Sequence, residues 1–197
     1  GRTVARAARR AGRGFMLLSR CDSTLRGHYP LETEALRRQL EAEGLGVDGE
    51  VLCPFFKEGG RFTLGGVHYV RQGGELVPAA ETEFASDRTF GYRSSYLPDY
   101  IEEKTGGARP AGEVVLIPIE QLRALDYEGI AAKLCAVRGF GKVCVDAADY
   151  CDVKVFSVAL YRAAARGRRF LFRTAASLVK ALGGVSDRPL LRREEMV

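Results

Sequence analysis

The segment that decides the fold is VVLIPIEQLRALDYEGIAAKLCAVRGFGKVCVDAADYCDVKVFSVALYRAAARGRRFLF, residues 114–172. Short apolar, β-branched runs at 114–117, 142–146 and 169–172 alternate in it with two stretches of helical periodicity. Such alternation is typical of a parallel sheet with helices packed against it. The segment therefore predicts an α/β fold.

The same pattern continues towards the N-terminus. Residues 15–19 and 51–54 are two more apolar runs, so we expect five buried, mostly parallel strands flanked by helices. Asp126 is placed to cap one helix, and Gly44 can adopt the left-handed conformation that ends another. The predicted helices span residues 31–44, 94–104, 127–137, 153–164 and 174–183.

Residues 57–78 have a different character, because glycines arrive there in pairs around a short alternating stretch at 67–70. This pattern predicts a long loop followed by a small β-hairpin that projects from the sheet. A glycine-rich loop inside a compact domain is more often functional than decorative.

The composition is that of an ordinary globular protein. With 197 residues, 46% hydrophobic and 28% charged, we expect one domain over residues 1–197 and neither a disordered nor a fibrous chain. No apolar run approaches the roughly 18 residues of a membrane helix, and the N-terminus has no signal-peptide apolar region. The five cysteines form no C-x-x-C pair. We therefore expect a cytoplasmic protein with reduced cysteines and no membrane partner.

The net charge of +5 comes mainly from arginine, with 24 Arg and 6 Lys against 25 acidic residues. Arginine binds carboxylates and phosphates in a bidentate manner, so the excess indicates an anionic partner without naming it. The basic cluster at 165–173 raises nucleic acid as an alternative. That cluster spans a helix end and a buried strand, which divides its charges among different surfaces, and we expect no nucleic-acid partner.

The densest polar cluster, RCDSTLRGH at 20–28, directly follows the first predicted strand. Ligands of open parallel sheets bind at the carboxyl ends of the strands. Arg20 and Arg26 can hold a carboxylate, Ser23 and Thr24 can bind hydroxyls, and Asp22 can accept the proton of a hydroxyl that is being phosphorylated. The alternative is a structural turn in which Asp22 and Ser23 cap a helix and Arg26 forms a surface ion pair.

A second cluster, with Glu58, Gly59, Gly60 and Arg61, follows the second strand. Adjacent glycines let the backbone approach a ligand, and their amide groups can bind an anion. The alternative is a tight turn that leads into the hairpin, with Arg61 solvated. No Walker A string occurs in the chain, and no G-x-G-x-x-G string follows a strand and opens a helix.

Three further candidates stand at the ends of later strands: Asp146, Arg173 and Thr174. Thr174 has the alternative role of a helix cap. We expect structural roles for His28 and His68. Residues 81–83 and Asp87 either line the same cleft or form a solvated loop, and we expect the solvated loop. No metal-ligand spacing is present, so we expect no metal site.

Several motifs, in one order, resemble the four-carbon acid sugar kinase family, formerly a family of unknown function. The motifs are DSTLRG (22–27), PFF (54–56), GGR (59–61), GVHYV (66–70), ETEFA (81–85), Asp87, FGY (90–92), EKTG (103–106) and FRTAAS (172–177). The resemblance spans essentially the whole chain. It implies the N-terminal domain that binds the sugar acid, with ATP and Mg²⁺ bound by a separate C-terminal domain.

The resemblance also implies roles for individual residues. Asp22, Ser23 and Arg26 match the substrate-binding motif, with Gly27 closing it, and Arg61 matches the arginine of the glycine-rich loop. The ligand would be threonate, erythronate or a 3-oxo-tetronate type of acid. Arg20 stands where many members have Lys, and His28 where many have Asn, so the substrate details are open.

The chain departs from the family pattern at both ends. Members begin with a strand that ends in an Asp-Asp-x-Thr-Gly type of loop, and nothing similar occurs before residue 14. We therefore expect an incomplete form of the domain, without the first strand and without the ATP-binding domain, that binds no nucleotide by itself. An incomplete sheet exposes an edge that a second copy can cover, as a homodimer. A non-catalytic sugar-acid-binding module is the alternative to the kinase portion.

Overall fold

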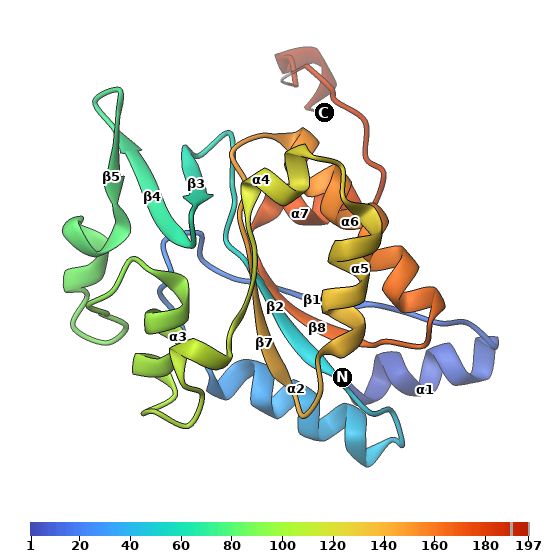
Figure 1. The fold of residues 1–197 in the computed structure, drawn as a ribbon. Coiled ribbons are helices and arrows are strands. Elements are labelled where there is room, and N and C mark those ends of the chain that lie inside the picture. Colours follow the sequence, from blue (N-terminus) through green and yellow to red (C-terminus); the bar gives the residue numbers. More distant parts are fainter. Residues whose placement is uncertain (190, 197) are drawn as a thin grey trace.

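The computed structural model describes residues 1–189 and 191–196. Its centre is a parallel sheet of five strands in the order β1-β8-β2-β7-β6 (Figure 1). Each lies within two residues of a predicted strand, so the α/β class and the parallel sheet are confirmed. The strands are β1 (Leu17–Arg20), β2 (Gly49–Cys53), β6 (Val115–Ile117), β7 (Gly141–Val145) and β8 (Phe170–Thr174).

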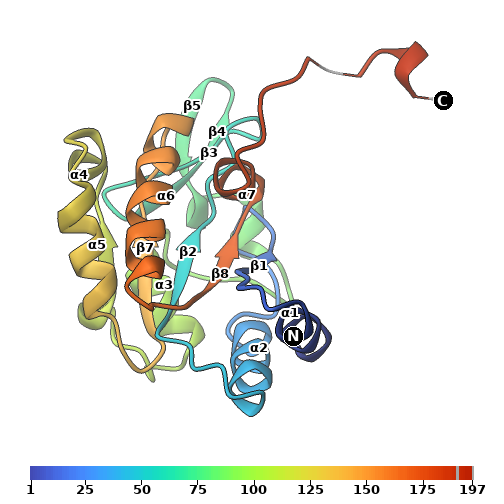
Figure 2. The ribbon, with the colours of Figure 1, turned by 90° about the vertical axis from the view of Figure 1, so that its right-hand side faces the viewer.

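Helices cover both faces of this sheet (Figure 2). One face carries α4 (Ile119–Arg123), α5 (Tyr127–Ala136), α6 (Tyr150–Ala165) and α7 (Ala176–Leu182). The other carries α1 (Arg2–Ala11), α2 (Leu31–Ala42) and α3 (Leu97–Lys104). Among the described residues after α7, Arg193–Glu195 form a short 3-10 helix, η4, away from the body of the domain.

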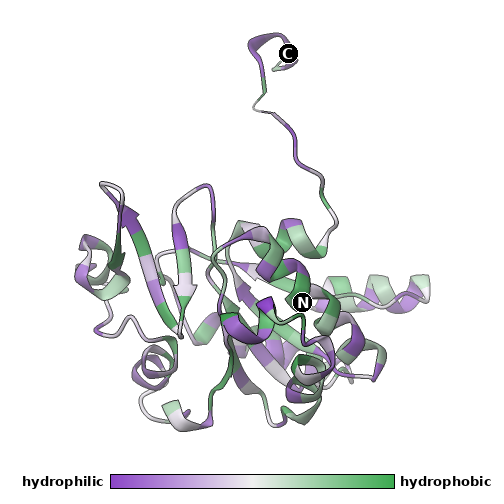
Figure 3. Cartoon of the chain, turned by 45° about the horizontal axis from the view of Figure 1, so that its top comes forward, coloured by the Kyte–Doolittle hydropathy of each residue, from purple (hydrophilic) through white to green (hydrophobic). Residues whose placement is uncertain are grey.

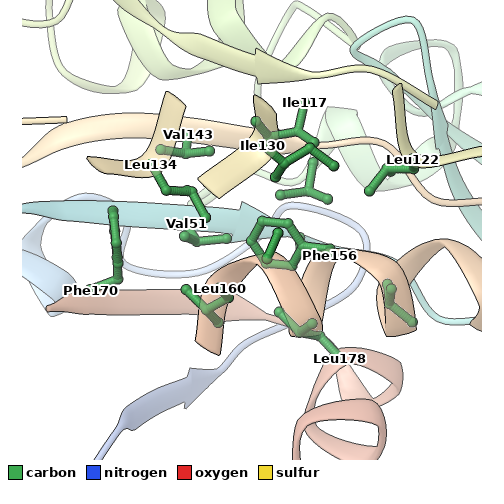
Figure 4. Close-up of a cluster of buried hydrophobic side chains, with 14 of the residues drawn as sticks. Val51, Ile117, Leu122, Ile130, Leu134, Val143, Phe156, Leu160, Phe170 and Leu178 are labelled. Carbon is green, nitrogen blue, oxygen red and sulfur yellow. The ribbon is translucent and has the colours of Figure 1, made fainter. Parts of the chain in front are cut away.

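The strands bury apolar side chains on both faces, because neighbouring residues point to opposite sides. Val51 belongs to the main core, where Phe156 and Leu160 of α6 pack against the sheet (Figure 4). The next residue, Leu52, belongs to a second core that includes Tyr100 and Ile101 of α3. Figure 3, coloured by hydropathy, shows hydrophobic residues along the central part of the domain.

Side-chain caps fix the helices where the sequence indicates them. Asp126 accepts a hydrogen bond of 2.8 Å from the amide of Gly129 at the start of α5, as predicted. Asp149 and Asp152 form a reciprocal capping box at the start of α6. Gly44 follows the end of α2 with a φ of 76°, the left-handed conformation expected of it.

The predicted hairpin is present and carries a third strand. Strands β3 (Arg61–Leu64), β4 (Val67–Gln72) and β5 (Glu75–Pro78) form a small antiparallel sheet beside the main one (Figure 1). The 3-10 helices η1 (Ala79–Glu81) and η2 (Glu83–Ser86) follow β5. An isolated bridge between Thr63 and Ala147 ties the small sheet to the loop after β7.

Some boundaries differ from those expected. α3 begins at Leu97 rather than at residue 94, and α7 begins at Ala176 because the hydroxyl of Thr174 donates to the carbonyl of Cys53 instead of capping the helix. Helices α1 and α4 and the 3-10 helix η3 (Ala111–Glu113) were not expected. Within the described ranges, no helix is both long enough and apolar enough to cross a membrane.

Candidate functional site

Three neighbouring parallel strands bring the two predicted clusters to the same edge of the sheet. β8 lies between β1 and β2, so the residues that follow β1 and β2 flank Arg173 and Thr174 at the end of β8. The loop after β1 is the Asp22 loop, residues 22–27. The turn after β2 is the glycine turn, residues 57–61.

The Asp22 loop is compact and has an unusual backbone. Leu25 has a φ of 68°, and its side chain is only 2% exposed. Gly27 has a φ of 124°, a conformation that residues with a side chain rarely adopt. Such backbone conformations are strained, and they persist only where contacts with the surrounding structure hold them in place.

Those contacts come from four side chains of other elements, which donate to four consecutive carbonyl groups of the loop. The pairs are Ser23 with His68 (2.8 Å), Thr24 with Tyr92 (2.9 Å), Leu25 with Tyr100 (2.7 Å) and Arg26 with Arg173 (3.0 Å). The donors belong to β4, the loop before α3, α3 itself and β8. The loop is therefore held in one conformation by the small sheet, α3 and the main sheet together.

His68 is neutral in this arrangement. Its Nε2 faces a carbonyl oxygen, which only accepts, so Nε2 carries the proton and Nδ1 accepts from the hydroxyl of Thr63 at 3.0 Å. Burial lowers the pKa of His68 to about 4, and the nearby charge of Arg61 adds to the effect. Both ring nitrogens of His68 are thus used in hydrogen bonds within the protein, which is the structural role expected of it.

The Asp22 carboxylate accepts three hydrogen bonds within its own loop. They come from the amide and hydroxyl of Thr24, at 3.1 and 2.6 Å, and from Nε of Arg26 at 2.7 Å. Burial acts to raise the pKa of Asp22, but the hydrogen bonds from Thr24 and Arg26 outweigh it, so the pKa lies below its usual value. Asp22 is therefore ionised at neutral pH and acts as an acceptor.

The glycine turn meets the Asp22 loop at the ring of Phe84, in η2. The guanidinium carbon of Arg26 lies 5.0 Å from the centre of this ring, and that of Arg61 lies 5.5 Å from it. Asp87 adds a carboxylate 3.9 Å from Nη1 of Arg26. The site therefore contains two arginines on one aromatic ring, flanked by the carboxylates of Asp22 and Asp87.

The turn's glycines are required by its geometry. Gly60 has a φ of 71°, and a Cβ at Gly59 would overlap the ring of Phe56. Arg61 donates to the carbonyl of Gly59 through Nη1, whereas its buried Nε has no hydrogen-bond partner among the described residues.

A small pocket opens beneath the Asp22 loop, lined by residues of the loop and of the strand ends that include Asp22, Arg173 and Thr174. Arg173 is 4% exposed, and its Nη1 has no partner in the described part of the chain. Burial also raises the pKa of Cys21, another lining residue, which keeps its thiol protonated.

Three predicted site residues lie apart from this constellation. Asp146 is fully buried and accepts hydrogen bonds from the amides of Gly65, Gly66 and Ile119 at 2.8, 2.9 and 3.2 Å, so it fixes the turn between β3 and β4. Glu58 accepts from the hydroxyl of Tyr150 on α6 at 2.7 Å. Arg20 ends β1 with an exposed side chain.

Sequence reasoning underrated the segment 81–87, which was expected to be a solvated loop rather than a wall of the same cleft. Phe84 and Asp87 contact the arginines, and Tyr92, beyond that segment, holds the Asp22 loop. The motifs ETEFA and FGY, both part of the family resemblance, were the available signal. In the described ranges, no group of three His, Cys, Asp or Glu side chains is arranged to hold a metal ion.

Comparisons with known proteins agree with this architecture. A family model described as a sugar-binding N-terminal domain matches residues 2–182. A search of curated proteins gave no match. Among solved structures, a domain of unknown function (DUF1537) from Bordetella bronchiseptica, described with bound citrate and as a domain-swapped dimer, is 28% identical with a TM-score of 0.62.

Two other solved structures resemble the chain in fold. They are Haemophilus influenzae protein HI1011 of family DUF1537, at 18% identity and a TM-score of 0.63, and a protein described as a putative tRNA synthase from Salmonella typhimurium, at 20% and 0.62. The matches cover 95%, 94% and 89% of this chain, but 42%, 43% and 38% of the Bordetella, Haemophilus and Salmonella chains. The chain thus spans less than half the length of these structures. With a family model that matches nearly all of its residues, it belongs to the family of sugar-binding N-terminal domains.

Proposed function

We propose that the chain binds a small sugar acid of the threonate, erythronate or 3-oxo-tetronate type and serves as the substrate-binding portion of an ATP-dependent kinase. The observation that carries the proposal is the approach of Arg26 and Arg61 to the same ring, that of Phe84, next to the ionised Asp22. Guanidinium groups suit the carboxylate of a sugar acid, and carboxylate oxygens suit its hydroxyls.

The available donors support an anionic ligand. Nε of Arg61 and Nη1 of Arg173 are buried without partners among the described residues, and an unpaired buried donor costs about 1–3 kcal/mol. A carboxylate bound beside these guanidinium groups would balance their positive charge. The Bordetella bronchiseptica structure was described with bound citrate, itself a small carboxylate with a hydroxyl group.

Asp22 is the candidate catalytic residue. Its low pKa makes it a weak base but keeps it ionised, so it can orient a substrate hydroxyl by accepting its hydrogen bond. Phosphoryl transfer depends mainly on positioning and on charge neutralisation, and a weak base is compatible with that. Ser23, Thr24, Gly27, the amide of Gly59 and the backbone of Gly60 complete the proposed substrate contacts; the amide of Gly60 itself donates to the carbonyl of Lys57 at 3.0 Å.

We assign ATP and Mg²⁺ to a partner domain, which belongs either to the same polypeptide or to a separate one. The described residues offer no three-carboxylate or histidine cluster for a metal, and the chain contains no Walker A string. The proposed contribution of this chain is to bind and orient the acid.

Calorimetric titration with threonate tests the proposal. Arg26→Ala and Arg61→Ala should each weaken binding by about tenfold or more, as expected for a lost charge-assisted contact. Arg93→Ala is the matched control, because the side chain of Arg93 is 90% exposed and belongs to the segment before α3. Equal affinity in all three variants would reject the arginine site.

A second measurement separates the kinase portion from a non-catalytic binding module. The chain is mixed with the ATP-binding domain of a longer relative, ATP, Mg²⁺ and threonate, and ADP formation is followed. Turnover that disappears in Asp22→Asn supports the kinase portion. Binding of threonate without any turnover supports the module.

A further inference from the structure

An arginine beside the glycine turn has no counter-charge among the described residues. Arg71, on β4, is exposed, and its side chain forms no ion pair and no hydrogen bond within residues 1–189 and 191–196. Other cations around the turn each have a partner: Arg26 pairs with Asp22, Arg61 donates to the carbonyl of Gly59, and Lys57 pairs with Asp149. Arg71 therefore adds an unneutralised positive charge next to the proposed acid site.

The side chain of Arg71 is held against the turn by packing. Its guanidinium carbon lies 5.8 Å from the ring centre of Phe62, a cation–π contact. Its backbone amide donates to the carbonyl of Gly60 at 2.8 Å. A Cβ built on Gly60 would lie only 3.0 Å from Cβ of Arg71 and 3.3 Å from its Nε. The guanidinium is thus positioned beside the turn, while its exposed N–H groups have no acceptor among the described residues.

Arg61 and Arg71 reach the glycine turn from opposite faces of the small sheet. Arg61 of β3 stands opposite Val70 of β4, and Arg71 is the next residue along β4, so its side chain points to the other face. Arg61 donates to the carbonyl of Gly59, and Arg71 packs against Gly60. The turn therefore lies between two guanidinium groups that face different sides.

We propose that Arg71 binds the phosphoryl group of the phosphorylated sugar acid. The acid would lie across the glycine turn, with its carboxylate at Arg26 and Arg61 and its phosphate at Arg71. This inference rests on the proposed function and adds to it a residue for a second anionic group. A kinase that binds only the carboxylate would have no use for a positioned cation on the far face of the turn.

The chemistry of a phosphoryl group suits this position. It carries about 1.5 to 2 negative charges near neutral pH, and its oxygens match the paired N–H donors of a guanidinium. Phosphoryl transfer also depends on neutralising the charge of the transferred group. Arg71 can supply part of that neutralisation from this chain, beside the Mg²⁺ that we assign to the partner domain.

Calorimetric titration with two acids and one inorganic probe tests the inference. The acids are erythronate and erythronate phosphorylated on its terminal hydroxyl, and the probe is pyrophosphate. The full chain should bind the phosphorylated acid about tenfold more tightly than erythronate at low salt, and this ratio should shrink as salt is added. Pyrophosphate should bind by itself, since Arg71 does not need the carboxylate site.

Variants of single arginines locate the phosphate contact. Arg71→Gln should bring the ratio of the two acid affinities close to one and weaken pyrophosphate binding by about tenfold. Arg71→Lys keeps the charge but not the paired donors, so it should retain part of the ratio. Arg38→Gln removes the same charge from an exposed position of α2 and should change neither result. Urea unfolding shows whether each variant is folded.

Several results would overturn the inference. They are a ratio near one in the unchanged chain, a ratio that Arg71→Gln leaves intact, and pyrophosphate binding that is absent or equal in Arg71→Gln and Arg38→Gln. Tartrate, with a carboxylate at each end, is a further probe. Tartrate binding as tight as that of the phosphorylated acid would make the second anion a carboxylate and would also reject the phosphoryl assignment.

Failure of the proposed function would look different. In that case neither acid binds, or Arg26→Ala leaves both acid affinities unchanged, and the pyrophosphate titrations alone decide whether Arg71 binds phosphate. If the proposed function holds, Arg26→Ala should weaken both acids to a similar extent and so preserve their ratio. The carboxylate contact and the phosphate contact can therefore fail independently.

Discussion

His68 of β4 and Ser23 of the Asp22 loop are joined by a hydrogen bond of 2.8 Å, from Nε2 to the backbone carbonyl oxygen. The bond links the small antiparallel sheet to the loop that follows β1. His68 is fully buried and neutral, so protonation of its Nδ1 would place a charge in the interior and remove the acceptor of the Thr63 hydroxyl.

This cost of protonation predicts a loss of stability in mild acid. The pKa of His68 is about 4 in the folded state, against an ordinary value of 6.5, so below pH 6.5 the unfolded chain binds more protons than the folded one. The free energy of unfolding should therefore fall from pH 6.5 to pH 4 by up to about 3 kcal/mol and then level off for this group. Urea unfolding across this range measures it.

The two histidines of the chain provide the control for this effect. His68→Gln keeps a donor for Ser23 but does not titrate, so it should remove the fall between pH 6.5 and pH 4. His28 is exposed and packs edge-on against Phe90, so His28→Gln should leave the fall in place. A wild-type curve that is flat in this window would contradict the assignment.

Arg173, which lies under the Asp22 loop, should be essential to the conformation of that loop. Arg173→Met keeps much of the buried volume but removes the donors to the carbonyls of Leu25 and Arg26, at 3.3 and 3.0 Å. We expect a loss of about 1–3 kcal/mol in unfolding free energy and faster hydrogen exchange in residues 22–27. Arg38→Met, at an exposed position of α2, should change neither. An Arg173→Met protein of unchanged stability and exchange would show that the other three donors suffice.

The sequence predicted the strands well because their signal is local. Runs such as 142–146 are apolar and bounded by glycine or charge, and burial in a parallel sheet demands that pattern. Strand β5 was missed because Glu75–Pro78 are half-buried or exposed and lack such a run. α1 was missed because its one large apolar residue, Val4, is exposed, and only the small Ala5 is buried.

The site could be predicted only in part. Strand ends located Asp22, Arg26 and Arg61, because topology alone brings the carboxyl ends of parallel strands together. Asp146 was predicted by the same rule because it stands at a strand end. Its carboxylate, however, accepts hydrogen bonds from the amides of Gly65 and Gly66 instead of facing the site. Which polar group satisfies a buried amide is decided by tertiary contacts that no sequence pattern contains.

Asp87 should weaken anion binding by competing for Arg26. Its Oδ2 lies 3.9 Å from Nη1 of Arg26, and hydrogen bonds from the amides of Phe90 and Thr89 hold its pKa below the usual value, so it is charged at neutral pH. Asp87→Asn should therefore tighten threonate binding by several-fold, more at low salt than at high salt. Asp99→Asn, at an exposed position of α3, is the control. Weaker binding in Asp87→Asn would mean that Asp87 contacts the ligand itself.

The glycine turn should not accept a side chain at Gly59. A methyl group there overlaps the ring of Phe56, so Gly59→Ala must displace that ring or the turn. We expect a cost of about 1–3 kcal/mol in thermal or urea unfolding, and weaker threonate binding because the turn positions Arg61 two residues later. Gly112→Ala has open space around its new methyl group and an ordinary φ, so it should be neutral. Equal stability of the two variants would exclude a tight turn.

Glu50 and Lys142 form a buried ion pair, so losing one of the two should destabilise the protein. The two residues face each other across β2 and β7, with side chains 0% and 1% exposed. Burial lowers the pKa of Lys142, and the charge of Glu50 opposes that shift. Removing one partner leaves an uncompensated buried charge, so Lys142→Met should cost about 3–5 kcal/mol in unfolding free energy.

Replacing both Glu50 and Lys142 shows whether the ion pair itself stabilises the protein or is only no worse than an apolar pair in its place. In Glu50→Leu combined with Lys142→Met, no charge remains to be desolvated, and the apolar replacements can pack against Phe140, whose ring centre lies 3.8 Å from Nζ of Lys142. The double variant should therefore recover most of the stability that Lys142→Met loses. Because Glu50 also lies 3.5 Å from the hydroxyl of Tyr29, a double variant no more stable than the single one would show that this tyrosine depends on Glu50 for its hydrogen bond.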